Sequence, residues 1–491
     1  VLGHQLSTKL GSVERATTAA LNASLLAVLK EFVIAVRRAM ENRRIKAPLM
    51  VVRGDGTLMS DEFAARTPVE TIHSGPAASA IGGRFLSHLD DALVIDIGGT
   101  TTDIALVENG QVAVSEEGAT VADYKTAVKA ANLFSIALGG DSHITPDSEN
   151  RIKIGPQRVT PLAYLTDQFP RIRRHLSALS QRSDAHLAPD WLEYWYLLRT
   201  PVDADWLQTE QEKELVDFLT EAPRPLPEIL THLNLFSKVQ INAGNLLRRE
   251  IIGKSGLTPT DLLHVEGRHS AWDVQTAFLA MDVFCRCMRY DPAEFREQIW
   301  LKMTETIVHA IVTFLSGKKL PLPFHSQDTD IGQWFFLNSL YDNHPQLETR
   351  FRLRRPIIGI GAPAAIFLKS VAEKLHCELI LPTHHEVANA VGAVAGNVMI
   401  TEEVLVYPRV TGDGLEVLGY TVQTGDNQEV FDEAADALTH ARKLGRERAL
   451  GAALRSGADN PEVIVKELTD GLDAYRIRAK AVGKPRLMRF E

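Results

Sequence analysis

The chain has 491 residues, which is too long for one ordinary domain and predicts two to four structural units. With 45% hydrophobic and 23% charged residues, it has the composition of a soluble globular protein. Its net charge of -9, without a block of lysine or arginine, argues against nucleic acid as the main partner.

Other global features indicate the cellular setting. Three cysteines give no disulfide framework, so we expect a reducing, cytoplasmic environment. The apolar run IVHAIVTFL is far too short to span a bilayer and no signal peptide is visible, so we expect no membrane partner. The first residue is Val rather than Met, which is typical of a fragment or a processed product.

The first predicted element is a long amphipathic helix that ends near Asn42. Leu25 and Leu29 belong to a series of apolar residues that keep helical spacing. A strand follows at PLMVVR. In HSGPAAS, Ser74 can cap a helix that has Pro76 in its first turn, and such a helix start leaves N–H groups that can face an anion.

The stretch ALVIDIGGTTTDIALVENGQ predicts a β-hairpin. Two apolar, β-branched runs flank the glycines and threonines, and Asn109-Gly110 after the second run is a strong turn signal. Gly98 and Gly99 allow a backbone shape that other residues resist, and they let a ligand approach closely.

The same hairpin carries the residue types of a phosphate and magnesium site. Successive N–H groups and the hydroxyls of Thr100, Thr101 and Thr102 can form a concave set of donors suited to a phosphate. Asp96 ends a buried strand, where a carboxylate is costly without a cation or donors. Mg²⁺ held by carboxylates such as Asp96 and Asp103, together with substrate phosphates, suits this pattern. The alternative is a polar, tight hairpin that binds nothing.

The rest of the chain contains α/β segments on either side of a long helical segment. IALGGDSHI predicts a second strand followed by a glycine turn. Helical patterns rich in Leu and Trp then replace the α/β pattern, and they predict an almost wholly helical insertion. A strand, glycine turn, helix and strand follow at PIIGIGAPAAIFLKSVAEKLHCELILP, and a small apolar helix at 387–398 is expected to be buried. Two strands, a charged helix and two more strands are expected at the end. The predicted units are an α/β core in two parts, residues 1–160 and 356–400, a helical insertion, 161–355, and an α+β region, 401–491.

Three shorter signals are weak. GKS at residues 253–255 would need a glycine five residues earlier to form a Walker A loop, and Arg248 stands there. HHE at residues 384–386 and the pair Cys285 and Cys287 lack the spacing of a four-ligand zinc site. A helix start and a helical core are the simpler interpretations.

The sequence GIGAPA is a stronger signal, because it fits a different kind of nucleotide-binding site. Gly359, Gly361 and Ala364 fit the glycine pattern of a dinucleotide-binding turn, between a strand and a helix. That pattern also needs an acidic residue at the end of the next strand, and Pro382 and Thr383 occupy that place. A nucleotide base or ribose against this turn, or a tight packing turn without a ligand, are the two alternatives.

The motifs together resemble a known family. DIGGTTTDIALV, followed much later by IIGIGAPAAIFL, resembles the split nucleotide site of the actin, Hsp70 and sugar kinase superfamily. More narrowly, ERATTAALNASL, DGTLMS, HSGPAAS, DIGGTTTDI, LGGDS, TPTDLLHVEGR and HHEVANAVGAVAG resemble the hydantoinase/oxoprolinase family, specifically its hydantoinase A chain. The resemblance implies an α/β fold with an actin-like ATPase (ribonuclease H-like) core, the large helical insertion and the small α+β C-terminal region.

The resemblance also implies an activity and a set of site residues. Family members use ATP to open a cyclic amide such as a hydantoin or 5-oxoproline, and related members are ATP-using subunits of ketone carboxylases. By match to the family motifs, Asp96 and Asp103 would act in catalysis by orienting Mg²⁺ or its waters. The residues expected to hold ATP or to lie on the substrate side are Gly98, Gly99, Thr100, Thr101, Thr102, Gly139, Gly140, Asp141, Ser142, Gly359, Gly361, Ala362 and Pro363.

One family feature is not found in the sequence. Superfamily members carry an earlier D-x-G-G-T-type loop that grips the phosphates from the opposite lobe, and nothing before residue 48 resembles it. We therefore expect that the chain lacks the N-terminal lobe or works without it. Two functions stay open: an ATP-dependent hydrolase of cyclic amides, and a non-catalytic or partner-dependent nucleotide-binding subunit of a multi-subunit hydrolase or carboxylase.

Overall fold

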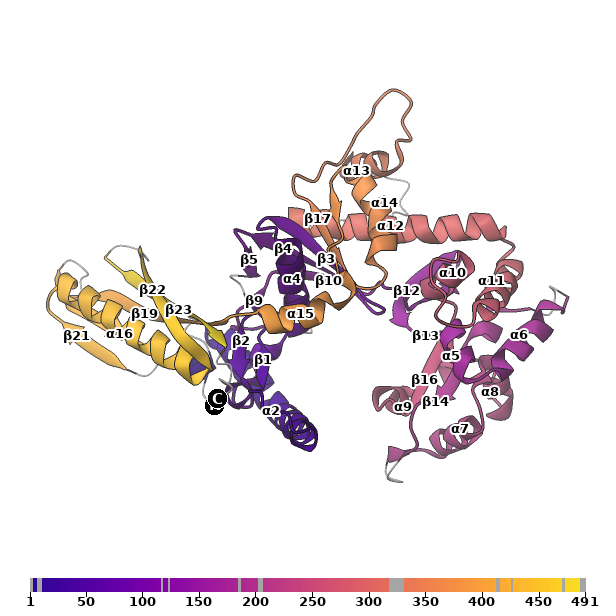
Figure 1. Ribbon diagram of the computed structural model, residues 1–491, viewed down its shortest axis with the longest axis horizontal. Helices are drawn as coiled ribbons and strands as arrows, with labels where there is room; N and C mark the ends of the chain where they lie inside the picture. Colours follow the sequence, from indigo (N-terminus) through magenta and orange to yellow (C-terminus); the bar gives the residue numbers. More distant parts are fainter. Residues whose placement is uncertain are drawn as a thin grey trace.

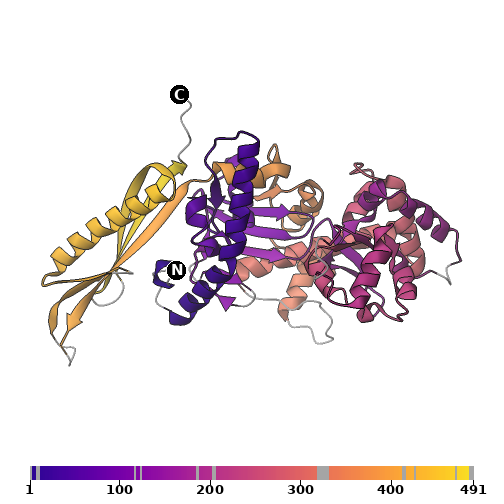
Figure 2. The same ribbon diagram turned by 90° about the horizontal axis from the view of Figure 1, so that it is seen from below.

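Three units follow one another along the long axis of the molecule (Figures 1 and 2). A central sheet carries helices on both faces, a mostly helical unit lies at one end, and a second sheet with one long helix lies at the other. The computed structural model describes residues 3–6, 11–115, 118–121, 124–183, 187–201, 206–317, 331–411, 416–424, 427–469 and 473–485.

The central unit is built on a six-stranded mixed sheet with the strand order β10-β4-β3-β17-β18, in which β5 also pairs with β4. The strands are β3 (Ala92–Ile97), β4 (Thr102–Glu108), β5 (Gln111–Val112), β10 (Leu133–Ile136), β17 (Ile357–Ile360) and β18 (Leu379–Ile380). β3, β4 and β10 are antiparallel neighbours, whereas β17 runs parallel to β3, and β18 parallel to β17. Ile360 pairs with Asp96, so the carboxyl ends of β3 and β17 lie side by side.

Alternation along β3 sends its side chains into two layers of core. Leu93, Ile95 and Ile97 pack in one cluster with residues of α12 and α14. Val94 packs on the other face, in a cluster that includes Ala80 of α4. Because successive side chains of a strand point to opposite faces, the apolar residues of this one strand serve both layers. The covering helices are α4 (Ser74–Ser87), α12 (Pro292–Ser316), α14 (Ala364–Lys374) and α15 (Ala388–Ala395).

Two glycines allow α4 and α15 to cross at very short range. A Cβ atom on Gly82 would lie 1.8 Å from the Ala388 carbonyl oxygen, and one on Gly392 would lie 1.8 Å from the Ala78 carbonyl oxygen. No side chain can occupy such a space, so the backbones of the two helices are in direct contact.

The expectation of a buried helix at 387–398 is wrong. The helix spans Ala388–Ala395, and within it only Ala388 and Gly392 are buried, while the Val394 side chain is 80% exposed. The small residues set the distance to α4 rather than filling an interior. A narrow contact face is enough for this purpose, so composition alone overstated the burial.

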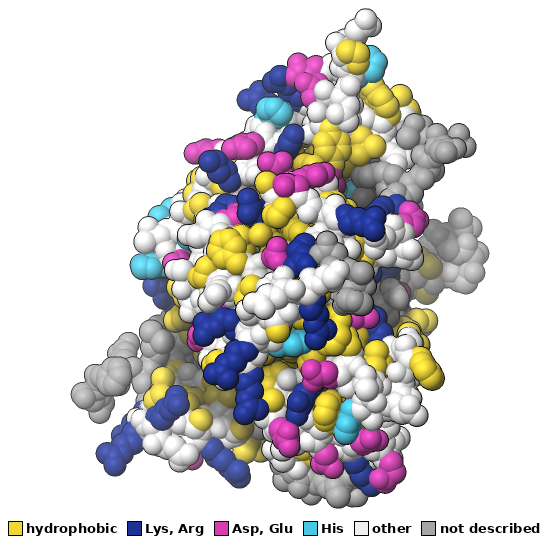
Figure 3. All heavy atoms as spheres, turned by 90° about the vertical axis from the view of Figure 1, so that its right-hand side faces the viewer, with side chains coloured by type: hydrophobic (Ala, Val, Ile, Leu, Met, Phe, Trp, Pro, Cys, Tyr) yellow, Lys and Arg dark blue, Asp and Glu magenta, His cyan; other side chains and the backbone are white. Residues whose placement is uncertain are grey.

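The insertion is not almost wholly helical, as the sequence predicted. It contains a four-stranded sheet with the order β13-β16-β14-β15. The strands are β13 (Thr160–Pro161), β14 (Tyr194–Leu197), β15 (Arg224–Pro225) and β16 (Ile252–Gly256). They are two to five residues long, and β16 reads IGKSG, so none has the alternating apolar pattern by which strands are recognised. Figure 3 shows the outer end of this unit, where acidic, basic and hydrophobic side chains are interspersed.

Helices surround this small sheet. The helices and 3₁₀ turns of the region are α5 (Leu162–Gln168), α6 (Arg171–Ser180), η3 (Pro189–Leu192), α7 (Glu210–Thr220), α8 (Leu226–His232), η5 (Lys238–Gln240), α9 (Gly244–Arg248), α10 (Pro259–Val265), α11 (Val274–Met288) and α13 (Ile331–Tyr341). α12 and α13 differ from the others because they lie at the central unit (Figure 1): α12 packs on α14 and on β4 and β10, and Lys374 of α14 donates to the Leu340 carbonyl oxygen of α13. Part of the predicted insertion therefore belongs to the helical layer of the central sheet.

Within the described residues, two helices are long and apolar enough to cross a membrane by length and composition: α2 (Ser12–Asn42) and α12. Half of the apolar window of α12 is buried inside the protein, which accounts for its composition. In α2, near the N-terminus, 11% of the corresponding window is buried. Length and composition by themselves do not establish a membrane span, because core helices of soluble proteins pass the same test.

The C-terminal unit includes strands from the N-terminal segment. Its seven-stranded sheet has the order β1-β2-β19-β20-β21, and β23 pairs with both β19 and β22. In the C-terminal segment, β19, β20 and β21 precede α16, which is one strand more than predicted. The elements of the unit are β1 (Met50–Val52), β2 (Leu58–Ser60), β19 (Val398–Val410), β20 (Val417–Gln423), β21 (Gln428–Phe431), α16 (Ala434–Arg455), β22 (Ala458–Thr469) and β23 (Tyr475–Pro485). The remaining elements are α1 (Gly3–Leu6), α3 (Asp61–Ala64), η1 (Pro68–Thr71), β6 (Val114–Ser115), β7 (Thr120–Val121), β8 (Tyr124–Lys125), β9 (Ala130–Ala131), β11 (Ser142–Pro146), β12 (Ile152–Arg158) and η6 (His385–Val387).

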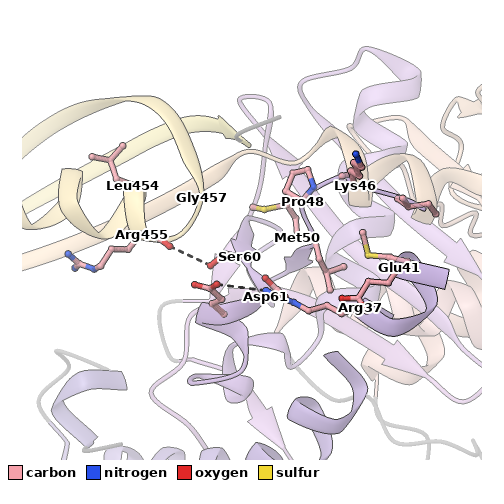
Figure 4. Close-up of a pocket in the computed structure, with 15 residues that line it drawn as sticks. Arg37, Glu41, Lys46, Pro48, Met50, Ser60, Asp61, Leu454, Arg455 and Gly457 are labelled. Carbon is pink, nitrogen blue, oxygen red and sulfur yellow. Dashed lines mark hydrogen bonds and ion pairs between the residues drawn. The ribbon is translucent and has the colours of Figure 1, made fainter. Parts of the chain in front are cut away.

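A cavity of about 450 Å³ lies where the end of α2, the β1–β2 hairpin and the end of α16 meet (Figure 4). The Ser60 hydroxyl donates to the Arg455 carbonyl oxygen over 3.4 Å, and Arg37 forms an ion pair with Asp61. The first contact joins the N-terminal segment to α16 of the C-terminal unit, and the second joins α2 to α3.

The α4–α15 contact gives a direct stability prediction. Gly82→Ala places a methyl group where the Ala388 carbonyl oxygen lies, so the helices must separate, and we expect a loss of about 1–3 kcal/mol or more in the free energy of unfolding. Gly75→Ala on the same helix is the matched control, because a Cβ atom there meets nothing within 4 Å. That variant should stay within about 1 kcal/mol of wild type, since alanine favours helix. Equal denaturation midpoints for the two variants would contradict the close crossing.

Candidate functional site

The two glycine turns that the sequence singled out lie next to each other at the carboxyl ends of β3 and β17. Gly361 has a φ of +92°, and its amide donates to the His385 carbonyl oxygen over 3.0 Å. A Cβ atom on Gly361 would lie 2.2 Å from the Ile97 carbonyl oxygen and 2.8 Å from Asp96 Oδ1. The backbone of the second turn therefore rests directly against the last residues of β3, although the two turns are distant in sequence.

The β3–β4 hairpin holds two facing carboxylates. Asp96 and Asp103 are cross-strand partners, the Gly98 amide closes the turn on the Thr101 carbonyl oxygen over 3.0 Å, and the Thr101 hydroxyl donates to Asp103 Oδ2 over 3.2 Å. Burial raises the pKa of Asp96 above its ordinary value, a hydrogen bond from Ser79 opposes this, and the charge of Asp103 raises it further. A cation between the two carboxylates would relieve both costs.

A third glycine turn, Gly139–Ser142, packs against the Gly98–Thr101 turn. The amides of Gly140 and Asp141 donate to the carbonyl oxygens of Gly98 and Gly99 over 3.0 and 2.8 Å. A Cβ atom on Gly99 would lie 2.3 Å from Asp141 Oδ2, so the two turns are packed backbone to side chain. The Ser142 hydroxyl accepts from the Gly139 amide over 2.9 Å and is buried, so it closes its own turn rather than facing a ligand.

The predicted residues differ in how open they are to a ligand. Thr102 is fully buried and its hydroxyl donates to the Leu138 carbonyl oxygen over 2.8 Å, whereas Thr100 is exposed and Thr101 half-buried. Gly359 lies inside β17, where a Cβ atom would lie 2.8 Å from the side chain of Leu368. Gly361, Ala362 and Pro363 form the turn beyond the strand and are partly or fully exposed.

Sequence reasoning missed two polar residues that support Asp96. The Asn389 side-chain amide, at the start of α15, donates to the Ser79 hydroxyl and to the Gly75 carbonyl oxygen, both over 2.9 Å. Ser79 in turn hydrogen-bonds Asp96. Both residues lie in motifs quoted above, HSGPAAS and HHEVANAVGAVAG, but which side chain meets which requires the α4–α15 crossing.

The TPTD motif also reaches the site. Thr260 binds the Gly140 carbonyl oxygen through its amide (2.9 Å) and its hydroxyl (2.8 Å). Asp261 caps α10 by accepting from the amide and the hydroxyl of Thr258, and it accepts from the Ala163 amide over 2.8 Å. The motif therefore ties the start of the insertion to the third glycine turn.

The weak signals have structural roles. Lys254 of the GKS sequence lies in β16, 3.5 Å from Glu193 and above the ring of Trp195. Cys285 is buried in α11, and burial raises its pKa to about 12, so its thiol is unreactive. Within the described ranges, no group of three or more His, Cys, Asp or Glu side chains is arranged to hold a metal ion.

Comparison with known proteins relates part of this chain to a family. Residues 15–163, which include the hairpin and the third turn, match the family described as hydantoinase/oxoprolinase. The chain is 23% identical over 158 residues to caprolactamase subunit alpha of Pseudomonas jessenii, covering 32% of this chain and 23% of that subunit. It is 25% identical over 162 residues to the acetophenone carboxylase gamma subunit of Aromatoleum aromaticum, covering 32% and 22% of the two chains.

The likeness in fold extends much further than the likeness in sequence. The crystal structure of the ATP-dependent caprolactamase from Pseudomonas jessenii superposes with a TM-score of 0.55 at 12% identity, over 99% of this chain and 60% of that one. The chain thus spans less than two thirds of the length of these relatives. At this identity the superposition shows a shared mixed α/β fold.

The buried Asp261 predicts a change of stability with pH. Burial raises its pKa from 3.8 to about 6, so between these values the folded state binds more protons than the unfolded state. The stabilising contribution of the protonated group is complete below about pH 4 and is lost as the pH rises to about 6. In Asp261→Asn, which cannot ionise, this component is absent. The difference in the free energy of unfolding between wild type and variant should therefore shift by about 3 kcal/mol over this window, as denaturant titrations at several pH values can measure. A constant difference would show that Asp261 has an ordinary pKa.

Proposed function

We propose that this chain takes part in the ATP-dependent opening of a cyclic amide of the hydantoin or 5-oxoproline type, because residues 15–163 match the hydantoinase/oxoprolinase family. The observation that carries the proposal is the contact between Gly361 and Asp96, which joins the two halves of a split nucleotide site. A shared ligand gives a physical reason for two glycine turns of this kind to meet at adjacent strand ends.

The topology of the central sheet supports an actin-like ATPase core. Three antiparallel strands, β10, β4 and β3, continue into the parallel strands β17 and β18, and helices cover both faces. In open α/β sheets, ligands bind outside the carboxyl ends of the strands. Both glycine turns lie at that edge of the sheet.

The residues of the hairpin fit a magnesium–nucleotide complex. A Cβ atom on Gly98 would have no neighbour closer than 3.7 Å, so an anion has room to approach the backbone of that turn, although the Gly98 amide itself donates to the Thr101 carbonyl oxygen. Asp96 and Asp103 are hard oxygen ligands, and two carboxylates completed by phosphates and waters are typical of Mg²⁺. We assign the phosphates to the Gly98–Thr101 turn, Mg²⁺ or its waters to the two carboxylates, and the adenosine to Gly361–Pro363.

ATP supplies the activation that the amide lacks. Transfer of the γ-phosphoryl group from ATP to the amide oxygen releases ADP and gives an imidate-like phosphate ester. Water adds to the carbon of this ester, the ring carbon–nitrogen bond breaks to free the amine, and a second water hydrolyses the resulting acyl phosphate to a carboxylate and phosphate. The chain's own residues contribute position and charge: the turn amides and the Thr100 hydroxyl hold the phosphates, the Thr101 hydroxyl orients Asp103, and the third turn, Gly139–Asp141, borders the substrate side.

A second candidate function is a partner-dependent nucleotide-binding subunit. Both relatives named above are subunits of larger enzymes, and the chain covers 60% of the caprolactamase chain. A site of this kind closes on the γ-phosphate only when donors face it from both sides. The remaining donors would then come from another chain or another part of the gene product.

Binding of nucleotide tests the site itself. We expect Asp96→Asn and Asp103→Asn to weaken Mg²⁺-dependent ATP binding by at least about tenfold, because each removes one of two charged ligands. Isothermal titration with and without Mg²⁺ measures this effect. Asp432→Asn makes the same change on the exposed surface of the C-terminal unit and should bind like wild type. Equal affinities for all three variants would exclude the hairpin as the metal site.

Turnover separates the two candidate functions. For residues 1–491 alone we expect slow ATP hydrolysis, and stimulation by a cyclic amide once the complete gene product or a partner subunit is supplied. Asp96→Ala should reduce the stimulated rate by about a hundred- to thousandfold. Fast lactam-stimulated hydrolysis by this chain alone, lost in Asp96→Ala, would instead show that the site is complete without a partner.

A further inference from the structure

A second cavity, of about 600 Å³, lies between the β11–β12 hairpin and the insertion. Figure 1 shows β12 at the junction of the two units. The β-hairpin contributes His143, Ile144 and Lys153 to the lining, and the insertion contributes Glu193 and Lys238. None of these residues belongs to the nucleotide turns, so the cavity needs an explanation of its own.

Glu193 is a buried charge with one oxygen left for a ligand. Its side chain is 8% exposed, and Oε1 accepts from Trp195 Nε1 over 2.8 Å with Lys254 Nζ 3.5 Å away. The nearest cation to Oε2 is Lys238 Nζ at 3.8 Å, and no described residue hydrogen-bonds that oxygen. Lys254 and Trp195 lower the pKa of Glu193 by favouring its charged form, against the effect of burial. The carboxylate therefore stays ionised and can accept a further donor.

Lys238 and Asp190 at the mouth of the cavity are both free to turn toward a ligand. Their side chains are each 52% exposed and lie 3.9 Å apart, too far for a hydrogen bond. Lys153, from β12, is a second exposed cation at the cavity. The third acidic residue of the lining, Asp147, is already used by Arg151 and by its own turn. Positive and negative groups are thus balanced, which disfavours a ligand with a large net charge.

His143 and the apolar residues complete the cavity. The His143 ring lies against Gly256, where a Cβ atom would be 2.3 Å from its Nε2 atom. Burial lowers its pKa to about 4, so at neutral pH the ring is uncharged and can donate or accept one hydrogen bond. Pro146, Pro156 and Pro189, which are partly or fully exposed, supply apolar surface to the same cavity.

We propose that this cavity binds a free α-amino acid with an apolar side chain. Lys238 lies within 3.9 Å of both Glu193 and Asp190, so the cavity holds a cation and two carboxylates close together. An amino acid carries its ammonium and carboxylate groups on one Cα atom, at a similarly short distance, and can therefore meet both kinds of charge. The ligand ammonium takes the place of Lys238 beside Glu193 Oε2 and Asp190. Its carboxylate accepts from Lys238, and the side chain meets the apolar part of the lining. This assignment does not depend on the nucleotide site.

Ligands that differ by one group test the assignment. Leucine, methionine and phenylalanine are titrated into the wild-type chain by calorimetry at millimolar concentrations. For leucine, 4-methylpentanoate lacks the ammonium group and 3-methylbutylamine lacks the carboxylate. We expect leucine to bind at least about tenfold more tightly than either analogue, since each loses one set of charge-assisted hydrogen bonds. No binding of the three amino acids, or equal binding of leucine and one analogue, overturns the proposal.

Two variants at the mouth locate the site without disturbing the buried Glu193 and Lys254 pair. Lys238→Gln should weaken leucine about tenfold without weakening 3-methylbutylamine, and Asp190→Asn should weaken leucine without weakening 4-methylpentanoate. Lys213→Gln, an exposed lysine on α7, is the matched control. Thermal unfolding without ligand checks that all three variants fold. Folded Lys238→Gln protein that binds leucine as Lys213→Gln does would place the ligand elsewhere and refute the assignment.

Discussion

The parallel pairing of β17 with β3 is the constraint on which the rest of the central unit depends. It brings the Gly361 turn against Asp96 and Ile97, and the space between them excludes even a methyl group. The pairing closes a loop of more than two hundred residues, and closure entropy grows only slowly with loop length, so a large insertion is tolerated between the two strands. The insertion thus adds a unit to the molecule, while the carboxyl ends of β3 and β17, where the two glycine turns meet, stay paired.

The β3–β4 hairpin brings two carboxylates together, and the surrounding structure only partly offsets the free energy that this repulsion and the burial of Asp96 cost. Asp96 and Asp103 face each other across two strands, and the hydrogen bond from Ser79 favours the charged form of Asp96 against burial. Ser79 is held by Asn389, which depends on the α4–α15 crossing. A tightly packed pair of helices on one face of the sheet therefore fixes the position of a carboxylate at its edge.

The sequence predicted the parts of this arrangement that are local. The Gly98–Thr102 hairpin and the Gly361 turn were predictable because glycines between apolar runs leave few other conformations. The neighbours of these turns were not predictable: the hydroxyls of Thr102 and Ser142 are used inside the fold, and nothing in their spacing distinguishes them from Thr100.

Features that depend on contacts between distant parts of the chain were harder to predict from the sequence. The short strands of the insertion form because β16, IGKSG, has partners on both sides, not because its residues favour a strand. The periodicity of α12 predicted a helix but could not show that it packs on the central sheet. Likewise, the small residues of α15 indicated close packing, yet burial depended on a neighbour that lies far away in the sequence.

The two candidate sites are connected through one strand. β11 begins at Ser142, whose hydroxyl closes the third glycine turn, and the next residue, His143, lies in the second cavity. The β11–β12 ladder is irregular between Ser142 and Ile144, so His143 follows Ser142 at a break in the pairing, and a shift of β11 moves both residues. Thr260 ties the same turn to α10 through the Gly140 carbonyl oxygen. If filling the cavity changes nucleotide affinity, thermodynamic linkage requires nucleotide to change the affinity of the cavity by the same factor, and β11 is the physical route between them.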